Sequence, residues 1–156
     1  MKQMPEIEHV DLAIRRAELA DATTLAALIC ELGYETRTAE MEMRLQSILK
    51  DSHYTTFVAV AEGRVAGMVG TFCHDSYEHN SPSGRILALV VSETMRRRGI
   101  ARALIAAAEN DLAQKNIRRV ALNTRLERKD AHEFYESCGY VRNGFRFAKE
   151  LPVAAD

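Results

Sequence analysis

The sequence predicts an α/β (α+β) protein whose mixed, mostly antiparallel and twisted central sheet is flanked by helices. Its first half contains a hairpin of β-branched and aromatic residues, and its second half alternates strand-like and helix-like segments. The helices also carry apolar faces that need a sheet to cover. With 156 residues and no repeat or linker composition, the chain is expected to form one domain over residues 1–156.

The first half of the chain predicts a strand, two helices and a hairpin. Apolar residues recur at helical spacing in both helices, and the turn Glu62-Gly63-Arg64 separates the two strands of the hairpin. The expected elements are a strand over residues 10–17, a helix from its N-cap Asp21 to Gly33, a helix over about 38–50, and a hairpin with strands 54–61 and 65–73.

The second half begins with a polar loop over residues 74–84. The strand that follows, from Arg85 to Val91, is too apolar to be half exposed, so we expect it to lie centrally in the sheet. The further expected elements are a helix with Ala101, Leu104, Ile105, Ala108 and Leu112 on one face, a strand over 120–123, a helix with Ala131, Phe134, Tyr135 and Cys138 on one face that ends at Gly139, and a strand region over 140–151 with a turn near Asn143-Gly144.

Composition excludes several classes of function. A formal net charge of −1 argues against nucleic-acid binding, although Arg96 to Arg98 form one local basic cluster. No apolar run is long enough to cross a membrane, and the N-terminus lacks the pattern of a secretion signal, so a cytoplasmic protein without a membrane partner is expected.

The cysteines and a histidine-containing loop bear on metal binding and disulfides. Cys30, Cys73 and Cys138 are far apart, which argues against a disulfide framework or a zinc site. The pattern His-Asp-x-x-Glu-His over residues 74–79 has loose spacing for metal ligands. We therefore expect no metal.

The segment between the apolar strand and the next helix carries the clearest chemical signal. A helix start offers unpaired backbone N–H groups and the positive end of the helix dipole, so anions bind there. Gly99 and Ala101 keep the turn free of bulky side chains, and Arg96 to Arg98 add positive charge. These residues predict a phosphate site; the alternative is a solvated basic helix cap in which Gly99 serves only the bend.

Two motifs in this order resemble those of the GNAT superfamily of N-acetyltransferases. One is Leu89-x-Val91 followed by Arg96-x-x-Gly99-x-Ala101, and the other is the segment AHEFYESCGY over residues 131–140. The resemblance covers roughly residues 54–150, and the N-terminal elements also fall where the family places them. It implies the GNAT fold, acetyl-CoA as co-substrate and the acetylation of an amine.

The resemblance also assigns the co-substrate contacts. The main chain of Leu89, Val90 and Val91 is expected to pair with the pantetheine arm as a strand would. The backbone N–H groups that are expected to face the pyrophosphate are those of Arg97, Arg98, Gly99, Ile100, Ala101 and Arg102. The side chains of Arg96 or Arg98 are expected to add contacts.

Spacing alone favours Tyr135 as a core residue, because it lies on the apolar face with Phe134, but Tyr135 matches the family tyrosine that can protonate the leaving thiolate, and this match favours a catalytic role. Family members often have an asparagine where this chain has Arg128, which leaves Arg128 as either a co-substrate contact or a solvated loop charge. Asn123 faces the same choice between the cleft and a strand-end hydrogen bond. His132 is a supporting group or an exposed one.

The general base is not identified by sequence. The amine must lose a proton to attack a thioester, yet the apolar strand over residues 86–91 carries no carboxylate. The candidates are Glu31, Glu35, His74, Asp75, Glu78 and His79, each of which is otherwise a solvated surface group.

Together these observations predict an acetyl-CoA-dependent N-acetyltransferase that acetylates a primary amine of a small molecule by direct attack in a ternary complex. Acetylation of a protein lysine or N-terminus remains an alternative, because substrate residues lie in variable loops. A non-catalytic acyl-CoA-binding sensor is another, because the strand carboxylate is missing. The resemblance also makes a homodimer an expectation.

Overall fold

The computed structural model describes residues 11–154 of the chain. These residues fall into two compact units, one ending at Leu122 and the other beginning at Asn123. The single domain expected over residues 1–156 stays a prediction, and Val10, expected in the first strand, lies outside the described residues.

The first unit is built on a five-stranded sheet in the order β1-β2-β3-β4-β5. The pairs β1-β2, β2-β3 and β3-β4 are antiparallel, and the pair β4-β5 is parallel. The strands are β1 (Leu12–Arg16), β2 (Tyr54–Ala61), β3 (Arg64–His74), β4 (Ser83–Val91) and β5 (Val120–Leu122). The mixed, mostly antiparallel sheet predicted from the sequence is confirmed.

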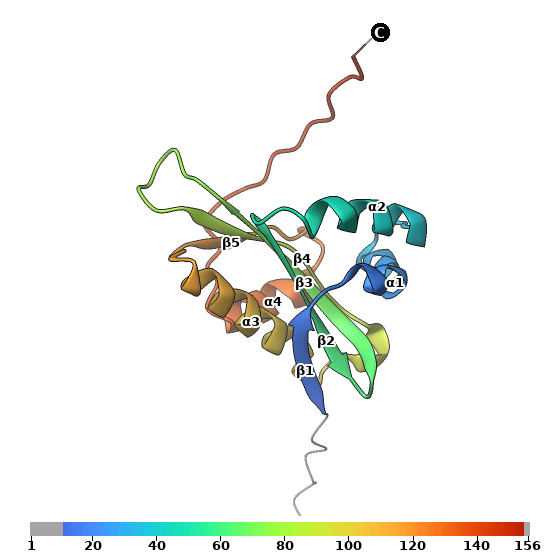
Figure 1. Ribbon diagram of the computed structural model, residues 1–156. Coiled ribbons are helices and arrows are strands. Elements are labelled where there is room, and N and C mark those ends of the chain that lie inside the picture. Colours follow the sequence, from blue (N-terminus) through green and yellow to red (C-terminus); the bar gives the residue numbers. More distant parts are fainter. Residues whose placement is uncertain (1–10, 155–156) are drawn as a thin grey trace, which may run out of the picture. The chain divides into compact units, whose positions relative to one another are not determined.

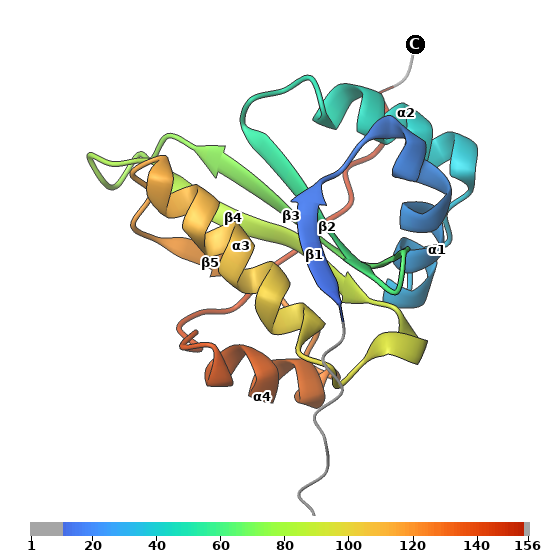
Figure 2. The same ribbon diagram turned by 60° about the horizontal axis from the view of Figure 1, so that its bottom comes forward.

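Helices cover both faces of this sheet. Figures 1 and 2 show α1 (Ala22–Leu32) and α2 (Thr38–Ile48) on one face, with α3 (Ile100–Gln114) across the other. Two short 3-10 turns, η1 (Leu19–Asp21) and η2 (Glu93–Met95), precede α1 and follow β4. The helix of the second unit is α4 (Lys129–Ser137).

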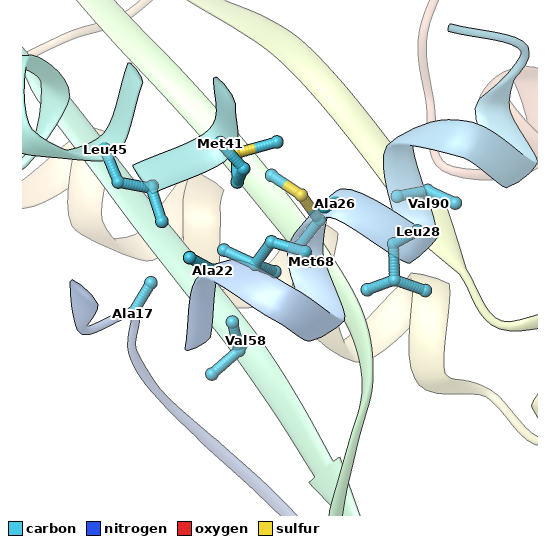
Figure 3. Packing of buried hydrophobic residues seen from close by; sticks show 10 residues of the cluster. Ala17, Ala22, Ala26, Leu28, Met41, Leu45, Val58, Met68 and Val90 are labelled. Atoms are coloured by element: carbon cyan, nitrogen blue, oxygen red, sulfur yellow. The ribbon is translucent and has the colours of Figure 1, made fainter. Parts of the chain in front are cut away.

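The core on the α1 and α2 face joins these helices to the middle strands. Leu25 is fully buried and belongs to one cluster with Leu45 of α2, Val58 of β2 and Met68 of β3. Figure 3 shows most of these side chains converging between the helices and the sheet. Burial of such side chains contributes about 1.5–3 kcal/mol each.

Two glycines set how closely the sheet approaches its other neighbours. A Cβ at Gly84 of β4 would lie 3.1 Å from side-chain atoms of Leu112 and Ile117, and one at Gly67 of β3 would lie 2.9 Å from the carbonyl oxygen of Val90. Position 84 therefore faces α3. This fixes which residues of β4 face which side of the sheet.

Strand β4 lies inside the sheet between β3 and β5, as its apolar composition predicts, although it is next to the edge strand rather than in the middle. It pairs with β3 from Ser83 to Val91, but with β5 only from Gly84 to Ile86. Helices α1 and α3 both pack against it, which accounts for its apolar character. The connecting loop is also shorter than expected, because His74 ends β3 and Ser83 begins β4.

The expected C-terminal strand region is wrong: residues 140–154 contain neither helix nor strand. Apolar residues are spaced as in a strand, yet Phe145 and Phe147 are 89% and 93% exposed. A strand exists only through its hydrogen-bonded ladder, and within residues 123–154 no second strand supplies one.

Asp21 stands at the N-terminus of α1 but does not cap it with its side chain. Its carboxylate accepts two hydrogen bonds of 2.8 Å from the guanidinium of Arg15, and one of 2.8 Å from the amide of Glu18. The bonds from Arg15 hold the pKa of Asp21 below its ordinary value of 3.8. This partly buried pair joins β1 to the start of α1.

Asp21→Asn should lower the free energy of unfolding by about 2 kcal/mol at neutral pH, because it leaves Arg15 without its charge partner. The depressed pKa stabilises the fold above pH 3.8 and that contribution is lost as the pH falls through the pKa of the folded state. Urea unfolding across this range should show a smaller acid dependence in the variant. The exposed Asp11→Asn is the control, and equal losses in both variants would contradict the assignment.

Candidate functional site

One edge of β4 is left open by a β-bulge. The ladder with β3 pairs Gly70 with Ala88 but Thr71 with Ile86, so Leu87 is the extra residue. The pairing with β5 ends at Ile86. Within residues 11–122, β4 therefore has no strand beside it on that side from Leu87 to Val91.

The ladder determines which main-chain groups point to the open edge. The amide of Ser92 donates to the carbonyl oxygen of Ala66 at 2.7 Å, so this pair is hydrogen-bonded. Because hydrogen-bonded pairs alternate in an antiparallel ladder, the main-chain groups of Val90 point to β3, while those of Leu89 and Val91 point to the open edge. An extended arm can thus add to β4 through the main-chain groups of Leu89 and the amide of Val91, since the carbonyl oxygen of Val91 already accepts from Arg96.

The loop after β4 is a sharply turned segment leading into α3. Arg97 and Gly99 both have left-handed backbone conformations, with φ values of 65° and 79°. Arg96 turns back and donates from Nε to the carbonyl oxygen of Val91 at 3.2 Å. Ile100, 2% exposed, anchors the first turn of α3 in the core.

The N-terminus of α3 presents main-chain donors toward open space. The first helical hydrogen bond runs from the amide of Ala103 to the carbonyl oxygen of Gly99 at 3.1 Å, so the amides before it have no acceptor within the helix. A Cβ built on Gly99 would meet no atom within 4 Å. A left-handed residue followed by helical ones aims successive N–H groups into one concavity, which suits a diphosphate.

The arginine side chains of the loop have different partners. Nη1 of Arg98 lies 3.2 Å from Oε1 of Glu62, in the turn between β2 and β3. Arg96 is hydrogen-bonded to the end of β4 through its Nε, and Arg97 is exposed. The expected side-chain contacts of Arg96 or Arg98 with phosphates therefore stay a prediction, while the backbone amides have the suitable geometry.

In the second unit, Tyr135 lies on a half-buried stripe of α4 with Ala131, Phe134 and Cys138, at the spacing that the sequence predicts. Its ring lies 5.4 Å from that of Phe134 and 6.1 Å from that of Tyr140, both edge-on. The helix ends where the amide of Tyr140 donates to the carbonyl oxygen of Tyr135 at 3.0 Å, with Gly139 at a φ of 93°.

Burial raises the pKa of Tyr135 above its ordinary value, and this outweighs the opposing effect of the positive charge on Arg128. Arg128 is the N-cap residue of α4, without a side-chain capping bond. A ring nitrogen of His132 lies 2.8 Å from the carbonyl oxygen of Arg125, which ties the helix to its preceding turn. Asn123 is exposed just after β5.

The candidate bases are not brought together. Glu31 accepts a hydrogen bond of 3.2 Å from the amide of Glu93, so it ties α1 to η2 near one end of β4. His74 pairs with Ser83 at the other end of β4, and Glu35 is exposed. Asp75, Glu78 and His79 lie exposed in the loop before β4, and no group of acidic, histidine and cysteine side chains within residues 11–154 is suited to hold a metal.

Comparison with known proteins gives the family. Residues 20–140 match the Acetyltransferase (GNAT) family. The chain belongs to this family. It is thus an acetyltransferase that uses acetyl-CoA to acetylate an amine, and the fold and co-substrate implied by the two motifs are confirmed.

Individual relatives span nearly the whole acetyltransferase. An aminoalkylphosphonate N-acetyltransferase of Salmonella typhimurium is 33% identical over 139 residues, which cover 88% of this chain and 90% of the relative. An aminoglycoside N(6')-acetyltransferase of Stenotrophomonas maltophilia is 28% identical over 131 residues, 81% of this chain and 84% of the relative. A solved aminoglycoside N-acetyltransferase in complex with CoA has the same fold, with a TM-score of 0.81, 22% identity, and coverage of 95% of this chain and 99% of that one.

Three features of the acetyltransferase were missed by sequence reasoning. The bulge at Leu87 leaves no signal in a uniformly apolar strand. The local sequence identifies Glu62 only as a turn residue, because its partner Arg98 lies 36 positions away. The pattern identifies Arg85 only as the start of the strand, although a lone charge in an apolar strand is itself a signal of function.

Between residues 11 and 154, no helix combines the length and apolar character that crossing a membrane requires.

The raised pKa of Tyr135 can be measured in this acetyltransferase. In an alkaline titration followed by ultraviolet difference absorbance, Tyr135→Phe should remove a phenol that ionises above the ordinary value of 10.0. The sign follows from burial, which disfavours the phenolate. Tyr77→Phe is the control, because Tyr77 is fully exposed and its loss should leave the high-pH ionisation of Tyr135 in place. A normal titration for Tyr135 would refute its burial.

Proposed function

We propose that this acetyltransferase transfers the acetyl group of acetyl-CoA to a primary amine of a small molecule, by direct attack in a ternary complex. The observation that carries the proposal is the open edge of β4 leading directly into the unobstructed amides at the start of α3. The curated relatives support the small-molecule acceptor, since their names specify aminoalkylphosphonate and aminoglycoside substrates.

In this proposal the donor is held mainly by main-chain groups. Leu89 and Val91 offer their edge to the amide groups of the pantetheine arm, and Val90 contributes its buried side chain to the core instead. The amides from Arg97 to Arg102 receive the pyrophosphate, helped by the dipole of α3. Contacts from Asn123 and Arg128 to the co-substrate are part of the same proposal.

Tyr135 is proposed as the general acid. Acetyl-CoA supplies an acyl thioester, and its coenzyme leaves as a thiolate that needs a proton. Burial holds the pKa of Tyr135 above its ordinary value, so the phenol carries its proton at neutral pH, and the strongly basic character of a desolvated thiolate would draw that proton from it. The incoming amine must first be neutral, and the proposal assigns that deprotonation to none of the six candidate bases.

Gly99→Glu should weaken acetyl-CoA binding by at least about 100-fold, measured by calorimetry. The new carboxylate would occupy the open space beside the α3 amides and repel the phosphates. Binding equal to that of the wild type would refute the pyrophosphate assignment.

A pair of alanine variants separates backbone strain from lost contacts. Gly99 and Gly63 both have left-handed conformations and open space at the Cβ position. Gly99→Ala and Gly63→Ala should therefore each cost about 1 kcal/mol of stability. Only Gly99→Ala should also weaken acetyl-CoA binding.

Tyr135→Phe should lower kcat by about 10–100-fold while leaving the acetyl-CoA dissociation constant within about twofold, because only the transferable proton is removed. The measurement is steady-state kinetics together with calorimetry. Tyr77→Phe, at a fully exposed position, should change neither value. Unchanged turnover in Tyr135→Phe would remove Tyr135 from the mechanism.

A further inference from the structure

We propose that Arg85 binds an anionic group, a phosphonate or a carboxylate, on the amine that this enzyme acetylates. The inference rests on the proposed function and names the substrate class of the same site. Its acceptors are thus short amines that carry a negative charge, in preference to neutral amines and polycations.

The direction of Arg85 follows from its neighbours on β4. Gly84 faces α3, because a Cβ there would touch Leu112 and Ile117, and Ile86 is 5% exposed. Since successive residues of a strand point to opposite faces, Arg85 points to the face that α1 and α2 cover. After the bulge, Ala88 packs against the core cluster on that same face.

Arg85 is partly buried and has no protein partner. Three other arginines of the sheet and its flanking turns have partners: Arg15 with Asp21, Arg16 with Asp111, and Arg119 with Ser81. Arg85 has no hydrogen bond or ion pair within residues 11–154. Partial burial of a guanidinium without an acceptor is unfavourable, and a planar pair of donors suits the oxygens of a phosphonate or carboxylate.

The position of Arg85 fits a substrate whose amine reacts beside the bulge. Arg85 lies two residues before Leu87, about 7 Å along the strand, where the open edge of β4 begins. A flexible arginine side chain spans part of this distance. A substrate whose amine and oxyanion are separated by a few carbon atoms can therefore place its amine beside the bulge and its oxyanion on the guanidinium. The anion would then orient the amine toward the thioester.

An open hollow borders the ladder partner of Arg85. That partner is Phe72, whose ring lies 4.8 Å from that of Tyr54 and 6.0 Å from that of His74. Phe72, Tyr54 and His74 line a hollow of about 390 Å³ at this end of the sheet. Because directly paired residues of neighbouring strands lie on the same face, Arg85 lies next to one wall of this hollow.

A polycationic acceptor fits this end of the sheet less well. The hollow also contains Asp51 and Asp75, but Oδ1 of Asp51 is already 2.7 Å from Nδ1 of His53 and 2.9 Å from its amide nitrogen. The unpaired positive charge of Arg85, on the strand position opposite Phe72, repels additional ammonium groups. Arg85 thus favours a single amine with an anionic tail over an aminoglycoside.

The test measures binding and turnover separately. Aminoethylphosphonate is titrated into the CoA-loaded protein by calorimetry, and its acetylation is compared with that of ethanolamine and kanamycin. The variants are Arg85→Met, which keeps the apolar stem, and Arg85→Lys, which keeps the charge. Arg118→Met is the matched control, because Arg118 is an exposed arginine in the loop before β5.

Arg85→Met should weaken aminoethylphosphonate binding and raise its KM by about 30-fold, with kcat within about threefold. Arg85→Lys should recover part of the affinity, and Arg118→Met should resemble the wild type. Acetylation of ethanolamine should stay within about twofold in every variant, because it has no anion to lose.

The outcomes separate the two proposals. If wild type and Arg85→Met bind aminoethylphosphonate equally well, the inference is overturned. It is also overturned if the wild-type enzyme acetylates kanamycin but not aminoethylphosphonate, although the proposed acetylation of a small-molecule amine then stands. Phosphonate binding that depends on Arg85, without acetylation of any amine, supports the anion site and overturns the proposed function.

Discussion

Strand β4 is hydrogen-bonded along its whole length on one side, but only along its first part on the other. Its ladder with β3 runs along its whole length, while β5 accompanies it only from Gly84 to Ile86. The bulge at Leu87 marks the point where the second ladder stops. Beyond this point the outward main-chain groups of Leu89 and the amide of Val91 have no strand partner within residues 11–122, and an extended, amide-bearing ligand could satisfy them, as we propose.

The rest of the sheet unit holds this edge in place. Helices α1 and α2 bury the other face of the middle strands, and Gly67 and Gly84 give α3 and its neighbours close access. Two long-range contacts then fix the loop that follows: Glu31 receives the amide of Glu93, and Glu62 receives Arg98. Both carboxylates act on the approach to α3, so they position the amides that we propose for phosphate binding.

Sequence reasoning recovered what local chemistry dictates. Helical spacing identified α1, α3 and α4, β-branched residues identified β2 and β3, and Gly99 identified the turn before α3. It failed where the outcome depends on partners distant in sequence. Residues 140–151 have a strand-like pattern but no ladder, and Asp21 prefers Arg15 to the helix end because two charged bonds outweigh one cap.

The left-handed turn at Arg97 and Gly99 has a consequence for how such enzymes diversify. A surface that recognises its ligand through peptide groups is indifferent to most changes of side chain, provided the few dihedral angles that shape it are kept. Mutation is therefore free to alter side-chain charges, and if Arg85 selects the acceptor as we propose, its replacement would redirect the enzyme to other amines. The acyl donor would remain the same throughout.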